Sequence, residues 1–413
     1  MSKKEAVKTP SYYVRKRLIS NKPALFGLGI IAIAHIIAIL GYLIMPDSTP
    51  NANDGSALIK KKPIGFEIQL LKFRKKRKVE EQNILQKMYY GQESKYVIVP
   101  VKDYFTKGLR VYYTKYNYDD GIDSADIVSI TEPIYLGSST KLPSGLDENY
   151  YVKGDSVYFL DYKEHLNVLS KSQVIADFKT NNLEHRKFFL GTDKAGRDIL
   201  SRLLFGARIS LSIGFIAVVI SIFVGVVLGA LGGFFGGYID RFIMWLMTVV
   251  WSIPGIMLVI AISLALQSKG IWVAFVAVGL TMWVEVARVV RGQIISIKEM
   301  LFVEAAKALG IKNMRIIFLH ILPNIMGPLI VIATANFASA ILIEAGLSFL
   351  GLGVQPPMPS WGMMVNEGFN SIGSRNSAYL VILPSLCISL TVLAFNLFGN
   401  GLRDAYDPKT VEG

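Results

Sequence analysis

Long apolar runs alternate with polar segments along most of this 413-residue chain. Six runs are long enough to cross a hydrocarbon core of about 30 Å as helices, which rise about 1.5 Å per residue. They lie at 24–45, 209–232, 242–266, 270–287, 325–344 and 379–399. The pattern therefore predicts an all-α membrane protein with six transmembrane helices, interrupted by one large polar segment.

Basic residues before the first span indicate the orientation of the chain. This tail holds only Glu5 against Lys3, Lys4, Lys8, Arg15, Lys16, Arg17 and Lys22. Positive charge favours the cytoplasmic side, so we expect a cytoplasmic N-terminus. Counting spans then places 47–187 outside, 288–324 inside, and the C-terminus inside. A secretory signal peptide is the alternative for the first span, but its apolar run is too long and no small-x-small site follows it.

The segment at 47–187 has the composition of a folded domain outside the membrane. Short runs rich in β-branched and aromatic residues, with turn-forming residues between them, predict strands near 96–100, 109–113, 127–130 and 157–160. We therefore expect a β-rich extracytoplasmic insertion. Within it, residues 60–78 bracket apolar side chains with dense positive charge, which predicts an interfacial segment with its apolar side in the bilayer.

Composition supports a membrane protein and argues against a nucleic-acid partner. Apolar residues make up 52% of the chain and charged residues 18%, with a net charge of +13. The excess charge is concentrated in the N-terminal tail, in 60–78 and in 299–324. Such clusters indicate cytoplasmic flanks and contacts with membrane lipid.

The polar stretch at 299–324 predicts a helix, a break and a second helix between two spans. Glu304, Ala305 and Ala306 begin a helix whose small side chains let another surface approach closely. Gly310 is placed to end it, because glycine adopts the left-handed conformation without steric cost. Pro323 fits the first turn of the next helix, where its missing N–H is not needed.

These residues, continued by His320-Ile-Leu-Pro323-Asn324, resemble the EAA coupling loop of ATP-binding-cassette (ABC) importer permeases. The resemblance implies contact with an ATPase subunit through six residues. They are Glu304, Ala305, Ala306, Gly310, His320 and Pro323.

Three further blocks resemble the peptide and nickel importer branch, and within it the second, C-type permease. They are Leu190–Asp198, Ser348–Gly362 and Asn396–Pro408. The resemblance covers 11–46 and 188–408 but leaves out 47–187. It implies a type I ABC importer permease fold with a tail and first helix at 1–46, the insertion at 47–187, and a five-helix permease core at 188–408.

The resemblance also implies partners and a location. A permease of this kind works with a second homologous permease subunit, two ABC ATPase subunits and an extracytoplasmic substrate-binding protein in the bacterial inner membrane. The expected function is ATP-driven import, with peptides as cargo, by alternating access. Peptides, nickel chelates and other small cargo all remain open.

The chain itself has no sequence signature of an enzyme. Gly191–Asp198 imitates a phosphate-binding loop but lacks the Lys-Ser/Thr pair that such a loop needs. Its single cysteine, its four histidines and the absence of metal-ligand spacing predict no catalytic site, no metal and no cofactor. ATP hydrolysis is expected in separate subunits.

Two polar residues inside the fifth span are candidates for the translocation pathway, since ionisable and polar groups in spans are functional candidates. Asn336 either lines a cavity or bonds a neighbouring helix, and Glu344 either faces the outer mouth or the interface. In the second span, Gly225, Gly229 and Gly233 have small-xxx-small spacing, which predicts close helix packing.

Two other classes of function compete with import: a secondary transporter and an envelope assembly protein. A secondary transporter requires an internal repeat and a charged path through the membrane, and the sequence shows neither. A non-transporting envelope assembly protein, with 47–187 as its working part on a permease-like anchor, is the alternative that stays open. The intact coupling loop argues against it, because an anchor does not need one.

Overall fold

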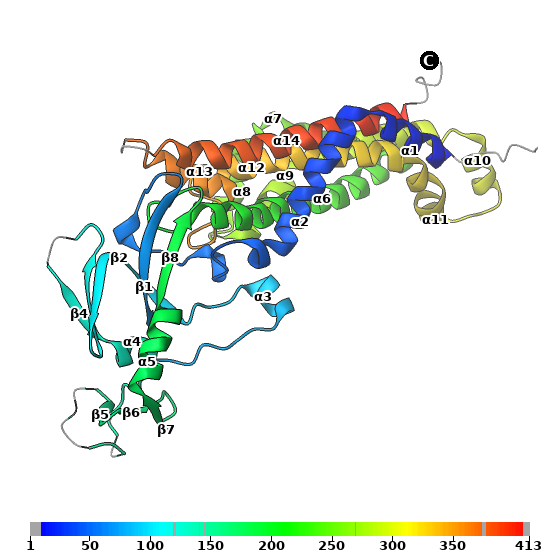
Figure 1. The fold of residues 1–413 in the computed structure, drawn as a ribbon. Coiled ribbons are helices and arrows are strands. Elements are labelled where there is room, and N and C mark those ends of the chain that lie inside the picture. Colours follow the sequence, from blue (N-terminus) through cyan, green and yellow to red (C-terminus); the bar gives the residue numbers. More distant parts are fainter. Residues whose placement is uncertain are drawn as a thin grey trace, which may run out of the picture. The chain divides into compact units, whose positions relative to one another are not determined.

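A computed structural model describes residues 10–118, 121–139, 141–143, 146, 148–268, 270–373 and 377–407. The chain divides into two compact units (Figure 1). The first comprises Met1–Ile39, Gly206–Phe369 and Val381–Gly413, and the second comprises Leu40–Phe205 and Asn370–Leu380. Lys3, Lys4 and Lys8, on which the predicted orientation partly rests, lie outside the described residues.

The first unit is a bundle of helices. Its elements are α1 (Pro10–Ser20), α2 (Lys22–Ile44), α6 (Ile199–Phe235), α7 (Gly237–Ser252), α8 (Gly255–Ala265), α9 (Ile271–Ile297), α10 (Leu301–Ala308), α11 (Asn313–Ile316), η4 (Ile317–Ile321), η5 (Leu322–Ile325), α12 (Met326–Phe349), α13 (Trp361–Phe369) and α14 (Tyr379–Tyr406). The long helices α6, α9, α12 and α14 run side by side (Figure 1). The ends of α2, α6 and α14 extend into the second unit.

Among the described residues, five helices are long and apolar enough to cross a membrane, and α7 with α8 makes a sixth if the bent pair is one span. Residues 242–266, predicted as one span, form two helices, because the chain bends by 95° between α7 and α8. Pro254 causes the break. It has no amide hydrogen and forces Ile253 into an extended conformation (φ −91°, ψ 128°).

Close helix packing at the glycines of α6 is confirmed. A Cβ on Gly225 would lie 2.5 Å from the Val286 Cβ of α9, and one on Gly229 would lie 2.5 Å from the Ala287 carbonyl oxygen. Only glycine allows the two backbones to approach this closely. The contact joins α6 to α9, the helix that leads into the loop at 299–324.

The second unit contains two antiparallel sheets. Five strands lie in the order β4-β3-β2-β1-β8 and three in the order β5-β6-β7. Their bounds are β1 (Phe66–Arg74), β2 (Tyr96–Lys107), β3 (Arg110–Lys115), β4 (Asp123–Asp126), β5 (Tyr150–Lys153), β6 (Ser156–Leu160), β7 (Leu166–Ser170) and β8 (Leu183–Phe188). Short helices complete the unit: η1 (Pro50–Ala52), η2 (Ala57–Ile59), α3 (Ile84–Tyr90), α4 (Ile127–Thr131), α5 (Lys171–Asp177) and η3 (Phe178–Asn182).

Three of the four predicted strands are confirmed as parts of β2, β3 and β6. The strand expected at 127–130 is wrong, since these residues form α4. Ile127, Val128 and Ile130 are all buried there. A short apolar run with no polar alternation does not distinguish a buried strand from a buried helix, so packing decided the outcome.

The interfacial segment predicted at 60–78 is also wrong in its apolar part. Residues 66–74 form β1, which lies between β2 and β8 in the five-stranded sheet. Leu70 and Leu71 point to opposite faces of the sheet and belong to two different buried clusters. These side chains are enclosed by protein and are not available to a bilayer.

Candidate functional site

The loop at 299–324 is built around the amphipathic helix α10. Val303 and Ala306 are buried in a cluster with Val290 and Ile294 of α9. Glu304 and Ala305 lie on the opposite, exposed face. The structure therefore divides the predicted contact residues, with Glu304 and Ala305 accessible to a partner and Ala306 fixing the helix to its base.

Gly310 ends α10 as predicted. Its φ is +74°, in the left-handed region. Its N–H donates to the Lys307 carbonyl at 2.9 Å, and the Ile311 N–H donates to the Ala306 carbonyl at 3.1 Å. This pair of bonds is a helix-terminating pattern that requires a left-handed residue at this position.

The second half of the loop returns the chain to the membrane. Pro323 is at the start of the 3₁₀ turn η5, as predicted, and is exposed. His320 is half-buried in the π-helical turn η4, and its carbonyl accepts a bond of 2.6 Å from the Asn324 side chain. Both residues lie on the loop, but neither is on α10.

Exposed apolar side chains surround α10, and sequence analysis did not single them out. Leu301 is 83% exposed and Leu309 80% exposed, at the two ends of the helix. Met314, Phe318 and Leu319 are also exposed. Exposed apolar patches indicate contact with another protein or with lipid. The sequence could have indicated this exposure, because these residues lie outside the apolar helix face formed by Val303 and Ala306.

The loop rests on a braced part of the bundle. Arg291 of α9 donates to both carboxylate oxygens of Asp240 in α7, at 2.5 and 2.7 Å. Lys298, at the end of α9, donates to the Gly233 carbonyl of α6 at 3.2 Å. The end of α9 that precedes α10 is therefore connected to both α6 and α7.

A cavity of about 1250 Å³ lies beside the loop, within the first unit. Its walls come from α1, α9, α12 and α14, and they include Pro323 and Asn324. Its charged lining residues are Arg15, Glu285, Arg403 and Asp407, and the remaining wall is mostly apolar. Its size suits a ligand the size of a small peptide.

The two residues predicted to line a pathway are both buried. Asn336 donates to the Ser221 hydroxyl of α6 at 3.3 Å, which favours the interhelical hydrogen bond that the sequence left open. Glu344 is fully buried between α6, α12 and the segment before α13.

Three serine hydroxyls donate to the Glu344 carboxylate. Ser348 does so at 2.7 Å, Ser210 at 3.3 Å, and Ser360 completes the set. Each serine oxygen also accepts a backbone N–H, from Val354, Trp361 and Met363 respectively. Glu344 thus anchors residues 354–363 to α6 and α12. Sequence analysis quoted Ser348 and Ser360 within a motif but assigned them no role.

The motif Leu190–Asp198 forms a structural clasp. Asp193 accepts N–H bonds from Ala195 and Arg197, and its carboxylate lies 2.7 Å from the Arg197 Nε. Asp198 accepts from the Ser201 N–H at 2.8 Å and from its hydroxyl, and so caps the start of α6. The side chains of Asp193 and Asp198 thus fix the conformation of the motif and the start of α6.

Burial raises the pKa of the Asp198 carboxyl above its ordinary value, and the nearby Asp47 acts in the same direction. An acid whose pKa is higher in the folded state stabilises the fold below its unfolded pKa, and that contribution is lost as the pH rises through the folded pKa. We expect the wild type to gain stability relative to Asp198→Asn as the pH falls from about 7 to about 4. Thermal unfolding of both chains across this range tests it, since asparagine keeps the cap; a constant difference would contradict the prediction.

Two family models match the chain. Residues 221–412 match the binding-protein-dependent transport system inner membrane component, and residues 9–63 match the N-terminal TM domain of oligopeptide transport permease C. The stretch between these ranges holds most of the second unit. The coupling loop, Asn336 and Glu344 all lie in the first matched range.

Several curated proteins are similar to this chain. The dipeptide transport system permease protein DppC of Alkalihalophilus pseudofirmus is 45% identical over 221 residues, 54% of this chain and 72% of the relative. The glutathione transport system permease protein GsiD of Salmonella typhimurium is 47% identical over 229 residues, 55% and 75% of the two chains. The oligopeptide transport system permease protein OppC of Bacillus subtilis is 39% identical over 239 residues, 56% and 77% of the two chains.

Among solved structures, an inward-facing conformation of the MetNI methionine ABC transporter is 20% identical, with a TM-score of 0.42 over 50% of this chain and 96% of that one. The identity and coverage of the curated relatives, together with the two family models, establish that this chain is related to these permeases and has the type I importer permease fold. This chain belongs to the binding-protein-dependent inner-membrane permeases of ABC importers, in the branch that contains the C-type subunits named for dipeptide, oligopeptide and glutathione transport.

Proposed function

We propose that this chain is the C-type permease of an ATP-driven peptide importer in the bacterial inner membrane, with both termini cytoplasmic. It works with a second homologous permease, two ABC ATPase subunits and an extracytoplasmic binding protein. The observation that carries the proposal is the orientation of helix α10. Its Glu304 and Ala305 are exposed and accessible to a partner, while Val303 and Ala306 pack against α9. The names of the relatives support peptides as cargo.

The mechanism is alternating access driven through α10. ATP binding closes the ATPase pair and moves the surface on which α10 rests. Because α10 is packed on α9, and α9 is braced by the Arg291–Asp240 pair, the movement is passed to the bundle as a rigid displacement. The two permeases then rock between inward-open and outward-open states.

Asn336 and Glu344 act in the pathway by shaping its walls. Asn336 ties α12 to α6, and Glu344 holds residues 354–363 and the start of α13 in place. The cavity of about 1250 Å³ beside the coupling loop is the proposed cytoplasmic exit. Transport then depends on these two residues through geometry, without direct contact with the cargo.

Affinity purification of the full chain in mild detergent, with mass spectrometry of its partners, tests the assignment. We expect a second permease and ABC ATPase subunits to co-purify, and a co-purifying binding protein would identify the cargo class. Recovery with envelope proteins and without an ATPase, from cells that express the whole system, would overturn the importer proposal in favour of the envelope assembly alternative.

The envelope alternative is kept because the insertion has hydrophobic clusters of its own around Leu70 and Leu71. We propose that within the importer this insertion docks the binding protein or another envelope component. Phe66 and Phe188 are direct neighbours across β1 and β8, so residues 66–188 can be replaced by a short glycine linker that leaves the Leu190–Asp198 clasp in place.

We expect this replacement to abolish peptide uptake while the ATPase still co-purifies. Uptake of labelled peptide by cells gives the result, and the amount of chain in the membrane fraction is the control. Unchanged uptake would remove the docking role.

A further inference from the structure

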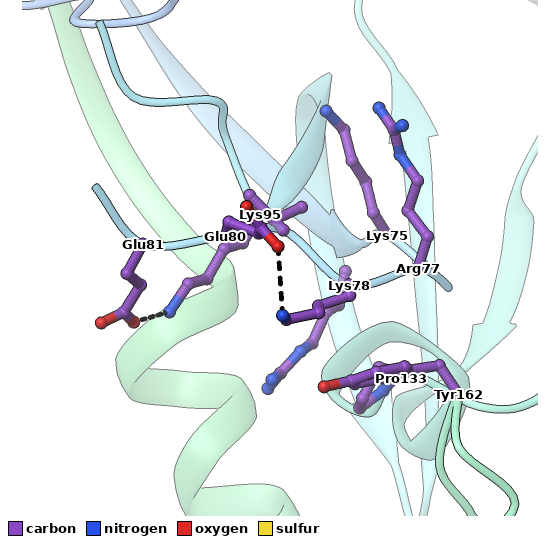
Figure 2. A pocket seen from close by; sticks show the side chains of 10 residues that line it. Lys75, Arg77, Lys78, Glu80, Glu81, Lys95, Pro133 and Tyr162 are labelled. Atoms are coloured by element: carbon purple, nitrogen blue, oxygen red, sulfur yellow. Dashed lines mark hydrogen bonds and ion pairs between the residues drawn. The ribbon is translucent and has the colours of Figure 1, made fainter. Parts of the chain in front are cut away.

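A strongly basic pocket of about 460 Å³ lies in the second unit, between the end of β1 and the start of β2 (Figure 2). Five of its lining side chains are cations: Arg74, Lys75, Arg77, Lys78 and Lys95. Pro133 and Tyr162 form an uncharged wall. The pocket lies outside the ranges that match the two family models.

We propose that this pocket binds the phosphate group of an anionic ligand.

The fold holds the cations together before any ligand arrives. Arg74 is the last residue of β1 and is paired with Tyr96 in β2. The Lys75 N–H donates to the Lys95 carbonyl at 2.8 Å, which brings the two lysines together just after the end of β1 and just before the start of β2. Lys76, between two of the lining residues, is fixed by bonds to Ser129 and to the Glu132 carbonyl.

Glutamate side chains form ion pairs with these cations, but the ion pairs are weak. Lys78 lies 3.2 Å from Glu80, and Lys95 lies 2.5 Å from Glu81 (Figure 2). The side chains of these glutamates are 81% and 76% exposed. Ion pairs between such exposed groups contribute little to stability. A phosphate can therefore replace these carboxylates without disturbing the fold.

The charge balance favours a multivalent oxyanion. Lys75 and Arg77 share Glu93. Five cations thus face three carboxylates, Glu80, Glu81 and Glu93, which leaves two positive charges. A phosphate monoester carries about −1.5 to −2 at neutral pH and offers three acceptor oxygens. Arginine and lysine together bind such a group by charge-assisted hydrogen bonds.

The ligand has two sources with the same chemistry, an anionic phospholipid headgroup and a soluble phosphate compound. The full chain, purified in detergent, is titrated with inorganic phosphate and with glycerol phosphate at constant ionic strength in a calorimeter. The same chain, reconstituted with zwitterionic lipid and with added phosphatidic acid, whose headgroup is a phosphate monoester, is examined by native mass spectrometry for retained lipid. Retention of phosphatidic acid without binding of the soluble compounds identifies the headgroup, and the reverse identifies a soluble ligand.

Charge variants separate this pocket from general surface charge. We expect Lys78→Gln with Lys95→Gln to weaken binding by roughly tenfold or more, the effect of losing a charge-assisted bond. Glu80→Gln with Glu81→Gln is expected to strengthen binding, because it frees the same lysines. Lys102→Gln removes one charge from an exposed position on β2 outside the pocket and is expected to change nothing.

Thermal unfolding of each variant shows whether the fold is intact. Three results would overturn the proposal: no binding of either ligand class by the wild type, equal weakening by Lys102→Gln, or weaker binding after the glutamate substitutions. Binding is measured on this chain alone, so its outcome does not depend on the proposed transport function.

Discussion

Replacing Gly310 by proline is expected to abolish peptide uptake and ATPase stimulation while the chain still inserts in the membrane. Gly310 has a φ of +74°, whereas proline is restricted to a φ of about −65°. Proline also removes the N–H that bonds to the Lys307 carbonyl. The end of α10 must then rearrange, and the exposed face with Glu304 and Ala305 no longer meets the ATPase in the required orientation. Labelled-peptide uptake, ATPase rate and membrane-fraction yield give the three readouts.

Two companion variants show whether the effect belongs to the coupling contact. Glu304→Lys reverses the charge of an exposed side chain without touching the helix end, so it is expected to uncouple ATPase stimulation while α10 stays folded. Gly292→Ala, at a helical position in α9 with open space around it, is the matched control and should transport normally. Normal uptake in both Gly310→Pro and Glu304→Lys would remove the coupling role of this loop.

The largest loss of folding stability is expected from Glu344→Ala. It removes the shared acceptor of the Ser210, Ser348 and Ser360 hydroxyls, all of which are buried. A buried polar group left without a partner costs about 1–3 kcal/mol, and the missing carboxylate also leaves a cavity. Thermal unfolding of the purified chain in detergent measures the change.

Serine-to-alanine variants provide the controls for this network. Ser348→Ala removes one of three donors and is expected to cost about 1 kcal/mol. Ser263, in α8, is equally buried, but its hydroxyl has no hydrogen-bond partner in the part of the chain that the structure describes. Ser263→Ala should therefore be neutral or slightly stabilising. If Glu344→Ala and Ser263→Ala unfold alike, the carboxylate does not hold residues 354–363.

The membrane spans and the ends of the coupling helix could be predicted from sequence because their signals are local. A span depends on the length of one apolar run, and the end of α10 depends on Gly310 itself. The close approach of α6 to α9 could also be predicted from a local signal, since the spacing of Gly225 and Gly229 places both on one face of a helix.

Features that depend on distant residues were decided only by the tertiary structure. Residues 66–74 became a central strand because β2 and β8 pair on either side of it, and the apolar run at 127–131 became a helix because the sheet buries it. Glu344 acquired its three serine partners from α6, α12 and the segment before α13. The sequence alone determined the long apolar membrane helices and the end of α10, through the length of each apolar run and through Gly310. Which of their polar groups meet depended on folding, because no local pattern records the pairing of residues far apart in the chain.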